Sequence, residues 1–348
     1  MTADLKQLYK LYSENYIVDT DTRKIRKGSI FFALKGENFN GNKFAENALQ
    51  AGASYAIVDE IEYHNELNTI LVKNVLTTLQ NLANYHRKKL NLPILSLTGS
   101  NGKTTTKELI NAVLSKKFKT TATIGNLNNH IGVPLTLLSM TPETEIGIIE
   151  MGANHLYEID FLCKIAEPNF GYITNFGKAH LEGFGSIEGV IKGKSELYNF
   201  LRTNNGIAFV NTDDPIQIKQ SEGINIISFN KQEIKFIEAN PFVKISFKGI
   251  EITSKLIGKY NFNNIAAAIA IGNYFDIPQD KIKEGIENYT PTNNRSQIIE
   301  KGTNRIVLDA YNANPSSMFA ALENFHQLKD VTKILILGDM FELGEFSE

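Results

Sequence analysis

Short apolar runs alternate with amphipathic segments through the middle of the chain. Five runs have the length and composition of buried strands: "ILSLT" (94–98), "IGIIEMG" (146–152), "FGYIT" (170–174), "GIAFVN" (206–211) and "NIISF" (225–229). Helical patterns separate the first four runs, namely "TTTKELINAVLSKKF", "LYEIDFLCKIA" and "SIEGVIKGKSELYNFL". Because parallel strands need helical crossovers, this alternation predicts an α/β fold with a mostly parallel sheet covered on both faces.

The stretch before this region predicts a smaller α/β unit. It contains the strands "SIFFALKG" and "SYAIVD", the helix "KFAENALQAGA" between them, and the helix "TTLQNLANYHRKKL" that leads into "NLP". We predict an N-terminal domain over residues 1–88 and a central domain over residues 89–293. Within the central domain, residues 232–257 have an antiparallel pattern, and "NNIAAAIAIGNYF" predicts a closely packed alanine-rich helix.

A third unit begins near "NNRSQIIE" and covers residues 294–348. It predicts a strand at "RIVLDAY", a helix at "SSMFAALENFHQL" and a second strand at "KILILGD" (333–339). A sheet of so few strands cannot bury its faces. We therefore expect this C-terminal domain to be incomplete.

Composition and charge narrow the class of protein. The formal net charge of the 348 residues is −2, which argues against a nucleic-acid partner. The polar N-terminus lacks a signal-peptide pattern, and no apolar run approaches the ~20 residues of a membrane span. These features predict a soluble cytoplasmic protein without membrane insertion, which we expect to be monomeric. The lone cysteine, Cys163, excludes an internal disulfide and a cysteine-based zinc site, and its helical context predicts a core residue.

A glycine-rich corner, "TGSNGKTTT", joins the first central strand to the helix that follows it. Gly99 and Gly102 allow a tight turn whose backbone N–H groups converge on one point. Lys103 adds a positive charge, and Thr104 offers a hydroxyl for Mg²⁺. The first glycine lies three residues before Gly102 rather than five, which departs from the usual phosphate-loop spacing. The position between strand and helix still favours a polyphosphate ligand; the alternative is a Gly–Asn turn with a capping threonine.

Other polar side chains follow strands of the same predicted sheet. Glu150 ends one strand and His180 follows the next, so both should reach the edge where ligands bind in such sheets. Glu150 is a candidate Mg²⁺ ligand together with Thr104, or a strand-end cap. His180 is a candidate ligand or a structural histidine. Lys192 and Lys194 lie on the following helix, where a solvated face is the usual position for a lysine.

Seven motifs together resemble the Mur ligases, the ATP-dependent amide-forming enzymes of peptidoglycan precursor synthesis. In order they are "TGSNGKTTT", "GNLNNHIGVPLTLL", "IIEMGANHLYEI", "NFGKAHLEGFGSIEGVIKGKSELY", "GKYNFNNIAAA", "NRSQ" and "LDAYNANPSSM". The resemblance covers the chain from "DTDTRKIRKGSIFFALKGENFNG" to its last residue. "GANH", "YNANP" and "GDMFELGE" look like the member that joins D-alanyl-D-alanine to a UDP-N-acetylmuramoyl-tripeptide. The resemblance implies a UDP-substrate-binding N-terminal domain, a central ATP-binding domain with a phosphate-loop sheet, and a Rossmann-like C-terminal domain.

The resemblance also implies a catalytic centre, made of Lys103, Glu150, His180, Lys194 and Arg295. Lys194 occupies the position of the family's carbamylated lysine, in which the amine becomes an anionic oxygen ligand. Carbamylation needs an unprotonated amine, so a desolvated site would suit it. One Mg²⁺ would be held by Thr104 and Glu150, and a second by Glu150, His180 and carbamylated Lys194.

Substrate-binding residues are implied in the same way. The ATP site would comprise Gly99, Ser100, Asn101, Gly102, Lys103, Thr104, Thr105, Asn261, Asn264, Arg295 and Asp309. Arg295 would contact the γ-phosphate, and Asp309 the ribose or the hinge region. Asn264 would lie by the adenine or ribose, and Asn261 could also cap its helix. The other substrates would contact Thr22, Arg23, Asn128, Asn129 and His155, with the first two near the nucleotide sugar. "ALKGENFNG" would belong to the same face as Thr22 and Arg23, or form a hairpin turn.

The reaction that the resemblance implies activates a carboxylate. The tripeptide carboxylate attacks the γ-phosphate of ATP to form an acyl phosphate, and the amine of D-alanyl-D-alanine then displaces phosphate. Two anions must meet, and at ~4 Å two unit charges repel by ~4 kcal/mol at an effective dielectric constant of about 20. Lys103, Arg295 and Mg²⁺ would offset this repulsion. Alternatives are another Mur-type or folylpolyglutamate ligase, a phosphate-loop NTPase without ligase activity, and a nucleotide-binding scaffold.

Overall fold

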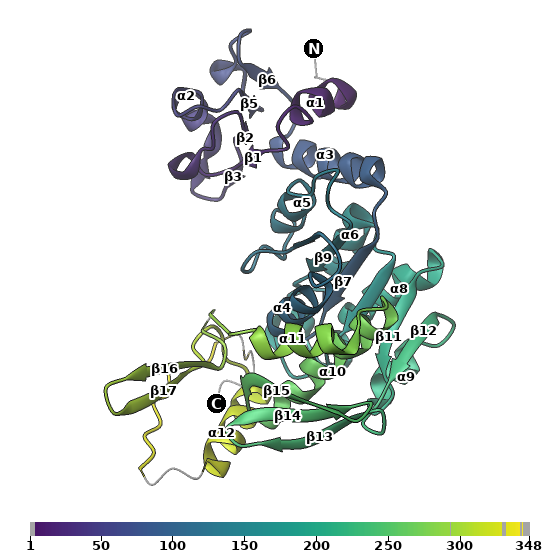
Figure 1. Cartoon of the computed structure of the whole chain (residues 1–348). Helices are drawn as coiled ribbons and strands as arrows, with labels where there is room; N and C mark the ends of the chain where they lie inside the picture. Colours follow the sequence, from purple (N-terminus) through teal and green to yellow (C-terminus); the bar gives the residue numbers. More distant parts are fainter. Residues whose placement is uncertain (1–3, 293, 329–331, 342, 344–348) are drawn as a thin grey trace.

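The computed structural model describes residues 4–292, 294–328, 332–341 and 343. Figure 1 shows a small N-terminal unit, a central sheet with its covering helices, and a C-terminal hairpin and helix beside the lower end of the central unit. In the described residues, no helix is both long and apolar enough to span a bilayer.

A parallel sheet of six strands forms the centre of the molecule. Its order is β12-β11-β10-β7-β9-β8, and every neighbouring pair is parallel. The strands are β7 (Ile94–Thr98), β8 (Thr120–Ala122), β9 (Ile146–Glu150), β10 (Phe170–Ile173), β11 (Ile207–Asn211) and β12 (Asn225–Phe229). The predicted parallel sheet is confirmed. The sequence pattern missed β8, because "TTA" is short and has no apolar run.

Helices cover both faces of this sheet. They are α4 (Lys103–Leu114), α5 (Gly132–Leu137), α6 (Glu158–Ala166), α7 (Leu181–Phe184), α8 (Ile187–Thr203), α9 (Pro215–Gln220), α10 (Phe262–Tyr274) and α11 (Gln279–Asn288). Leu95 and Leu97 of β7 pack into one core with α4, α10 and α11. Ile94 enters a second core on the opposite face, with α5, α6 and α8. Cys163 of α6 is fully buried in this second core, as predicted.

A separate antiparallel sheet lies below α10 and α11 in Figure 1. It consists of β13 (Ile234–Ala239), β14 (Phe242–Phe247) and β15 (Ile250–Ile257), which confirms the antiparallel pattern. Its buried side chains Val243, Ile245 and Ile252 share the core of α4 and α10. The three-residue turn η4 (Lys259–Asn261) then leads from β15 into α10.

The N-terminal unit is a second, four-stranded parallel sheet with the order β1-β2-β5-β6. Its elements are α1 (Leu5–Tyr12), β1 (Val18–Asp19), η1 (Thr22–Lys24), β2 (Ile30–Phe32), η2 (Gly41–Phe44), α2 (Ala45–Gln50), β5 (Tyr55–Val58), η3 (Ile61–Tyr63), β6 (Thr69–Leu71) and α3 (Val75–Leu90). Helix α3 packs against β2 and also against α5 and α6. The Tyr12 hydroxyl donates to the Leu138 carbonyl at 2.8 Å, and Arg87 Nε donates to that of Ala166 at 2.9 Å. The N-terminal and central units therefore share a buried interface.

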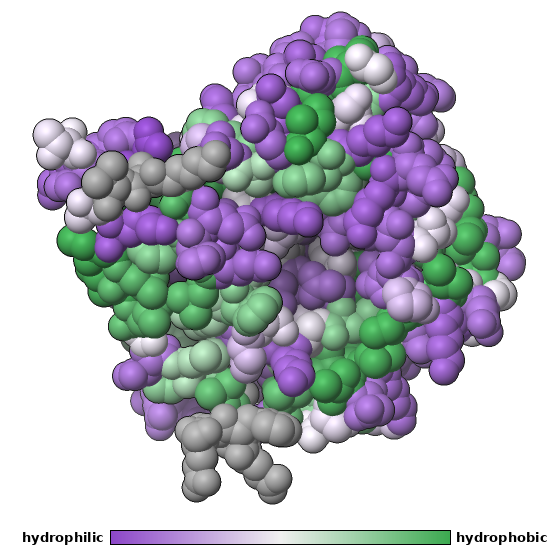
Figure 2. All heavy atoms as spheres, turned by 90° about the horizontal axis from the view of Figure 1, so that it is seen from below, coloured by the Kyte–Doolittle hydropathy of each residue, from purple (hydrophilic) through white to green (hydrophobic). Residues whose placement is uncertain are grey.

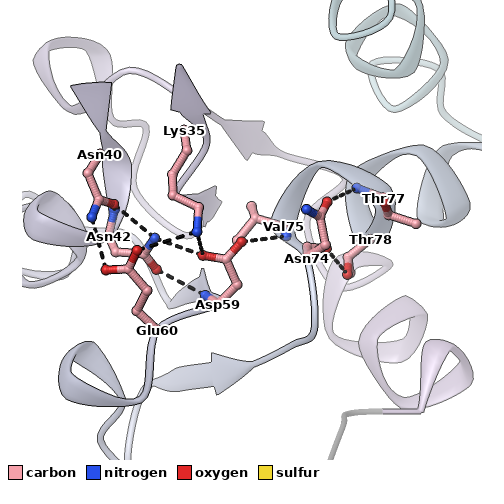
Figure 3. Close-up of polar contacts among 9 residues, drawn as sticks. All are labelled: Lys35, Asn40, Asn42, Asp59, Glu60, Asn74, Val75, Thr77 and Thr78. Carbon is pink, nitrogen blue, oxygen red and sulfur yellow. Dashed lines mark hydrogen bonds and ion pairs between the residues drawn. The ribbon is translucent and has the colours of Figure 1, made fainter. Parts of the chain in front are cut away.

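A buried carboxylate connects the N-terminal hairpin β3 (Lys35–Gly36) and β4 (Phe39–Asn40) to the start of α3. Figure 3 shows this network. Asp59 accepts from Lys35 Nζ at 2.9 Å, from Asn42 Nδ2 at 2.9 Å and from the Val75 N–H at 3.2 Å. Burial acts to raise the pKa of Asp59, but these hydrogen bonds outweigh it and hold the pKa below its usual value. "ALKGENFNG" thus forms the hairpin turn, and the Lys35 ammonium forms ion pairs with Asp59 and Glu60.

We expect Asn42→Ala to lower the free energy of unfolding by about 2–4 kcal/mol. The Asn42 amide is fully buried, donates to Asn40 Oδ1 and Asp59 Oδ1, and accepts from the Asp59 N–H at 2.9 Å. Alanine would leave that N–H without a partner and would remove one of the hydrogen bonds to the Asp59 carboxylate. Urea denaturation followed by circular dichroism measures the change. Gln50→Ala, which removes one exposed bond on α2, is the control and should change stability by less than about 0.5 kcal/mol.

The C-terminal unit contains the antiparallel hairpin β16 (Gln297–Lys301) and β17 (Asn304–Leu308), followed by α12 (Pro315–Gln327). The first strand and the helix predicted here are confirmed, but the strand predicted at 333–339 is wrong. Ile334 and Ile336 are 79% and 89% exposed. An apolar run becomes a strand only when a neighbouring strand pairs with it, and no described strand pairs with this one. Figure 2 shows broad apolar areas on the lower face of the molecule. Most of "FELGEFSE" lies outside the described residues.

Candidate functional site

The carboxyl ends of β7, β9 and β10 border a cavity of about 650 Å³, a volume typical of a small-molecule site. Loops after these strands line one side, the start of α10 another, and the C-terminal unit a third. The predicted site residues that line the cavity are Ser100, Asn101, Gly102, Lys103, Thr105, Asn128, Asn129, Glu150, His180, Asn261, Asn264, Arg295 and Asp309. Residues from distant parts of the sequence therefore meet in one place.

The glycine-rich corner has the shape of an anion-binding loop. Gly102 has φ = +77° and immediately precedes α4, so the helix N-terminus points its free N–H groups toward the cavity. A side chain at Gly102 would meet the Asn264 amide. Lys103 Nζ donates to the Gly99 carbonyl at 2.7 Å, across its own loop. Partial burial lowers the pKa of Lys103; Glu150 opposes this shift and Arg295 adds to it.

Glu150 is the buried acid of the site. Its Oε1 accepts from Thr104 Oγ1 at 3.2 Å and from Asn128 Nδ2 at 2.8 Å. Its Oε2 is buried and has no hydrogen-bond partner among the residues that the structure describes. A buried anionic oxygen without a partner is costly unless a cation completes it. Carboxylate and hydroxyl oxygens are ligands that Mg²⁺ prefers, so Glu150 and Thr104 fit that ion.

Two further predicted ligands lie on the same side of the site. His180 lines the cavity at the start of α7, with φ = +52°. Lys194 of α8 is fully buried, and its Nζ donates to the carbonyl of Ala153, a lining residue, at 2.9 Å. The solvated face expected for helical lysines is correct for Lys192, which is exposed, and wrong for Lys194. Burial, followed by the nearby Lys103 charge, holds the pKa of Lys194 well below its ordinary value.

Among the described residues, no group of three His, Cys, Asp or Glu side chains lies close enough together to hold a metal ion. The predicted ligand set contains only two such residues, Glu150 and His180. A second acidic ligand would exist only after carbamylation of Lys194. The low pKa of this amine and its place directly behind the cavity wall suit that modification.

The C-terminal unit closes the cavity over the phosphate corner. The Arg295 guanidinium carbon lies 3.9 Å from the centre of the Tyr311 ring, which orients the cation. Asn314 caps α12, and its Nδ2 donates to Asn101 Oδ1 at 2.7 Å. The Lys178 N–H donates to Ser316 Oγ at 3.0 Å. The first of these bonds holds the C-terminal helix against the loop that would carry phosphates, and the second holds it against the loop that follows β10.

The paired asparagines form a chain of hydrogen bonds at the start of α10. Asn264 Nδ2 donates to Asn261 Oδ1 at 2.8 Å, and Asn261 Nδ2 donates to the Ile257 carbonyl at 2.9 Å. Thr106 of α4 donates to Asn264 Oδ1 at 3.0 Å. Asn261 occupies the cap position, but its side chain makes no capping bond, so the predicted capping role is wrong.

Three predicted substrate residues do not line the cavity. Thr22 and Arg23 lie on η1 in the N-terminal unit, and the Arg23 side chain is 86% exposed and paired with Asp21. His155 is exposed, and its N–H donates to Glu158 Oε2 at 2.9 Å. Their roles stay predictions.

Sequence reasoning missed several lining residues, including Glu158, Asn175, Tyr260, Tyr311 and Asn314. One signal was available: "NPSS" has the cap residue and proline that start a helix, so Asn314 could have been placed at the N-terminus of α12. Glu158 and Tyr260 had no distinguishing local pattern. Their proximity to the site depends on packing between elements.

A glycine-rich corner at a helix N-terminus, a buried acid at the next strand end and a cation from a third unit are typical of an α/β enzyme that uses a nucleotide polyphosphate. Comparison with known proteins agrees. Residues 14–97 match the family profile "Mur ligase family, catalytic domain", residues 97–272 match "Mur ligase middle domain", and residues 294–348 match "Mur ligase, glutamate ligase domain". The chain belongs to the Mur ligase family.

Individual relatives are consistent with one branch of this family. The chain is 38% identical over 341 residues to the UDP-N-acetylmuramoyl-tripeptide–D-alanyl-D-alanine ligase of Bacillus subtilis, covering 95% of this chain and 75% of that protein. The crystal structure of MurF from Acinetobacter baumannii superimposes with a TM-score of 0.86 at 32% identity, over 98% of this chain and 80% of that one. The MurF ligase of Thermotoga maritima in complex with ADP superimposes with a TM-score of 0.77 at 28% identity, over 89% of this chain and 74% of that one.

Proposed function

We propose that the chain is an ATP-dependent ligase that joins D-alanyl-D-alanine to the free carboxylate of a UDP-N-acetylmuramoyl-tripeptide in peptidoglycan precursor synthesis. The observation that carries this proposal is the meeting of Lys103, Glu150 and Arg295 around one cavity. The relatives with this activity in their names align over nearly the whole chain.

We infer that ATP occupies the cavity with its phosphates at the glycine-rich corner. The relative from Thermotoga maritima was solved with ADP, which supports this choice of nucleotide. Thr104 and Glu150 would hold one Mg²⁺, and Glu150, His180 and carbamylated Lys194 a second. When bound, Mg²⁺ would neutralise phosphate charge and polarise the transferred phosphoryl group. The Glu150 oxygen that has no hydrogen-bond partner among the described residues is the feature of this chain that favours a cation here.

The chain's own residues would then reduce repulsion between two anions. Lys103, at the corner, and Arg295, opposite it, would bring positive charge to the γ-phosphate as the tripeptide carboxylate attacks phosphorus and ADP leaves. The products of that step are an acyl phosphate and ADP. The amine of D-alanyl-D-alanine would attack the acyl carbon, phosphate would leave, and the amine proton would pass to solvent. Contacts of α12 with the corner and with the loop after β10 would keep water from the acyl phosphate.

The remaining substrate contacts and boundaries are part of the same proposal. We assign the domains as 1–88 for the UDP-linked substrate, 89–293 for ATP and 294–348 for closure over the nucleotide. Asn128 and Asn129 would contact the peptide, and Thr22 and Arg23 the nucleotide sugar. His155 would contribute from the rim. Asn264 would lie by the adenine or ribose, and Asp309 by the ribose or the hinge region. The cytoplasmic location, monomeric state and lack of a nucleic-acid partner stay predictions.

Phosphate release from ATP tests the function. We expect release only when UDP-N-acetylmuramoyl-tripeptide and D-alanyl-D-alanine are both present, with one amide formed per phosphate by mass spectrometry. Omitting either substrate should reduce release to background. ATP hydrolysis that is equally fast without both substrates would favour an NTPase, and use of a single amino acid in place of the dipeptide would favour another Mur-type ligase.

A further inference from the structure

Lys107 is a fully buried lysine that has no part in the proposed reaction. It lies on α4, one turn after Lys103, and its side chain is 0% exposed. Its Nζ donates to Glu108 Oε1 at 2.6 Å and to the backbone carbonyl of Thr123. Burying an ammonium group costs free energy, and a methionine of similar length would fill the same space without that cost. The positive charge of Lys107 therefore has a role other than filling the core.

Thr123 connects this ammonium group to the acid of the site. Thr123 follows β8, and its N–H donates to the Ile148 carbonyl at 2.9 Å, which extends the pairing of β8 with β9. Its Oγ1 accepts from the Glu150 N–H at 3.0 Å. The Glu150 carboxylate in turn accepts from Thr104 Oγ1 at 3.2 Å. Because Thr104 and Lys107 both belong to α4, the bonds form a closed ring that runs from α4 through Thr123 and Glu150 and returns to α4.

The same ring fixes the start of the loop that leads to α5. Asn128 in this loop donates from Nδ2 to Glu150 Oε1 at 2.8 Å, and its carbonyl accepts from the Gly152 N–H at 2.8 Å. Asn128 and Glu150 both line the cavity. If the Lys107 bond were lost, the segment from Thr123 to Asn128 would keep its sheet pairing but lose its attachment to α4. Glu150 would keep its pairing with Leu97 of β7, but Thr123, whose hydroxyl accepts from the Glu150 N–H, would lose its bond to the helix that begins at the phosphate corner.

We propose that Lys107 is a positioning residue, which holds the Glu150 carboxylate and Asn128 against the phosphate corner so that Glu150 is preset to bind the divalent cation of the nucleotide. This inference rests on the proposed function and deepens it. Lys107 does not line the cavity and acts only through Thr123 and Glu150. Replacing Lys107 should therefore change metal affinity and turnover more than nucleotide affinity.

Binding of Mn²⁺ to the full chain with ADP, measured by electron paramagnetic resonance of free Mn²⁺, tests this role. We expect Lys107→Met to raise the Mn²⁺ dissociation constant by about 10–100-fold, the usual effect of losing a group that orients a metal ligand. The ADP dissociation constant without metal should change by less than about 2-fold, because the corner itself is intact. Lys116→Met is the matched control: it removes a lysine just beyond α4 that pairs with Glu284 away from the cavity, and should leave both constants unchanged.

Two more variants separate positioning from packing. Thr123→Val keeps the carbonyl but removes the hydroxyl that accepts from Glu150, so it should weaken Mn²⁺ binding as Lys107→Met does, and the double variant should be no weaker than the worse single one. Glu108→Gln should bind Mn²⁺ like the wild type. If Lys107→Met lowers the melting temperature but binds Mn²⁺ normally, the lysine is only structural and the inference is overturned. If Lys107→Met does not fold, normal Mn²⁺ binding by Thr123→Val overturns it.

The wild-type protein separates this inference from the function on which it rests. Mn²⁺ binding by wild type that depends on ADP, together with unaltered binding by Lys107→Met, defeats the inference alone. Absence of nucleotide-dependent Mn²⁺ binding in the wild type contradicts the proposed function as well.

Discussion

Replacing Lys194 with alanine should reduce ligation by at least about 10²–10³-fold, the loss typical of removing one preorganised charged group from an active site. Lys194 is fully buried, and its amine lies directly behind the cavity wall at Ala153. Burial and the nearby Lys103 lower its pKa well below the ordinary value. The neutral form, which reacts with CO₂, is therefore populated at a lower pH than in an exposed lysine. Steady-state phosphate release measures the loss.

Rescue distinguishes a lost carboxylate from a lost packing contact. We expect formate or acetate to restore part of the activity of Lys194→Ala, because a short carboxylate can enter the vacated space and supply the missing anionic oxygens. Removing CO₂ and bicarbonate should also lower wild-type activity reversibly. Lys192→Ala, two residues away on the exposed face of α8, is the control and should behave like the wild type. Full activity of Lys194→Ala without added carboxylate would show that carbamylation is not needed.

The central fold could be read from the sequence because its strands are buried on both faces. Leu95 and Leu97 face one core and Ile94 faces the other, so apolar residues occur on both sides of the strand and the run is easy to recognise. Strand β8 is recognisable only from its partner: "TTA" becomes a strand because Thr120 and Thr121 pair with β9. The run at 333–339 shows the reverse: no strand of the described part of the chain pairs with it, and the apolar pattern alone does not make it a strand.

The site was predictable where a local motif carries its own chemistry. The glycine corner and the strand-end position of Glu150 both place their side chains from neighbouring residues alone, and both line the cavity. Lys107 and Glu158 could not be found in this way. A lysine four residues after Lys103 looks like any helical lysine, and its importance comes from a bond to Thr123, which lies sixteen residues away on another element. Similarly, Asn314 meets Asn101 only because the C-terminal unit folds back.

We expect Lys103→Met to lower the rate of ligation by about 10²–10³-fold, equivalent to about 2.7–4 kcal/mol of transition-state stabilisation. In the structure the Lys103 ammonium is held across its own loop by the Gly99 carbonyl at 2.7 Å, with a weaker contact to Ser100 at 3.4 Å. A lysine at this point of a phosphate loop reaches the β- and γ-phosphates. Methionine keeps the length of the side chain but removes the charge, so the loop should keep its shape.

The position of the Lys103 charge predicts which nucleotide loses more affinity in Lys103→Met. Because the γ-phosphate is absent from ADP, Lys103→Met should weaken ATP binding by a larger factor than ADP binding, as measured by isothermal titration calorimetry with each nucleotide. Lys178→Met serves as the control, since Lys178 is an exposed lysine near the cavity rim and only its backbone N–H contacts Ser316. Equal losses of ATP and ADP affinity would place the Lys103 charge away from the γ-phosphate, and phosphoryl transfer at an unchanged rate would remove Lys103 from the catalytic centre altogether.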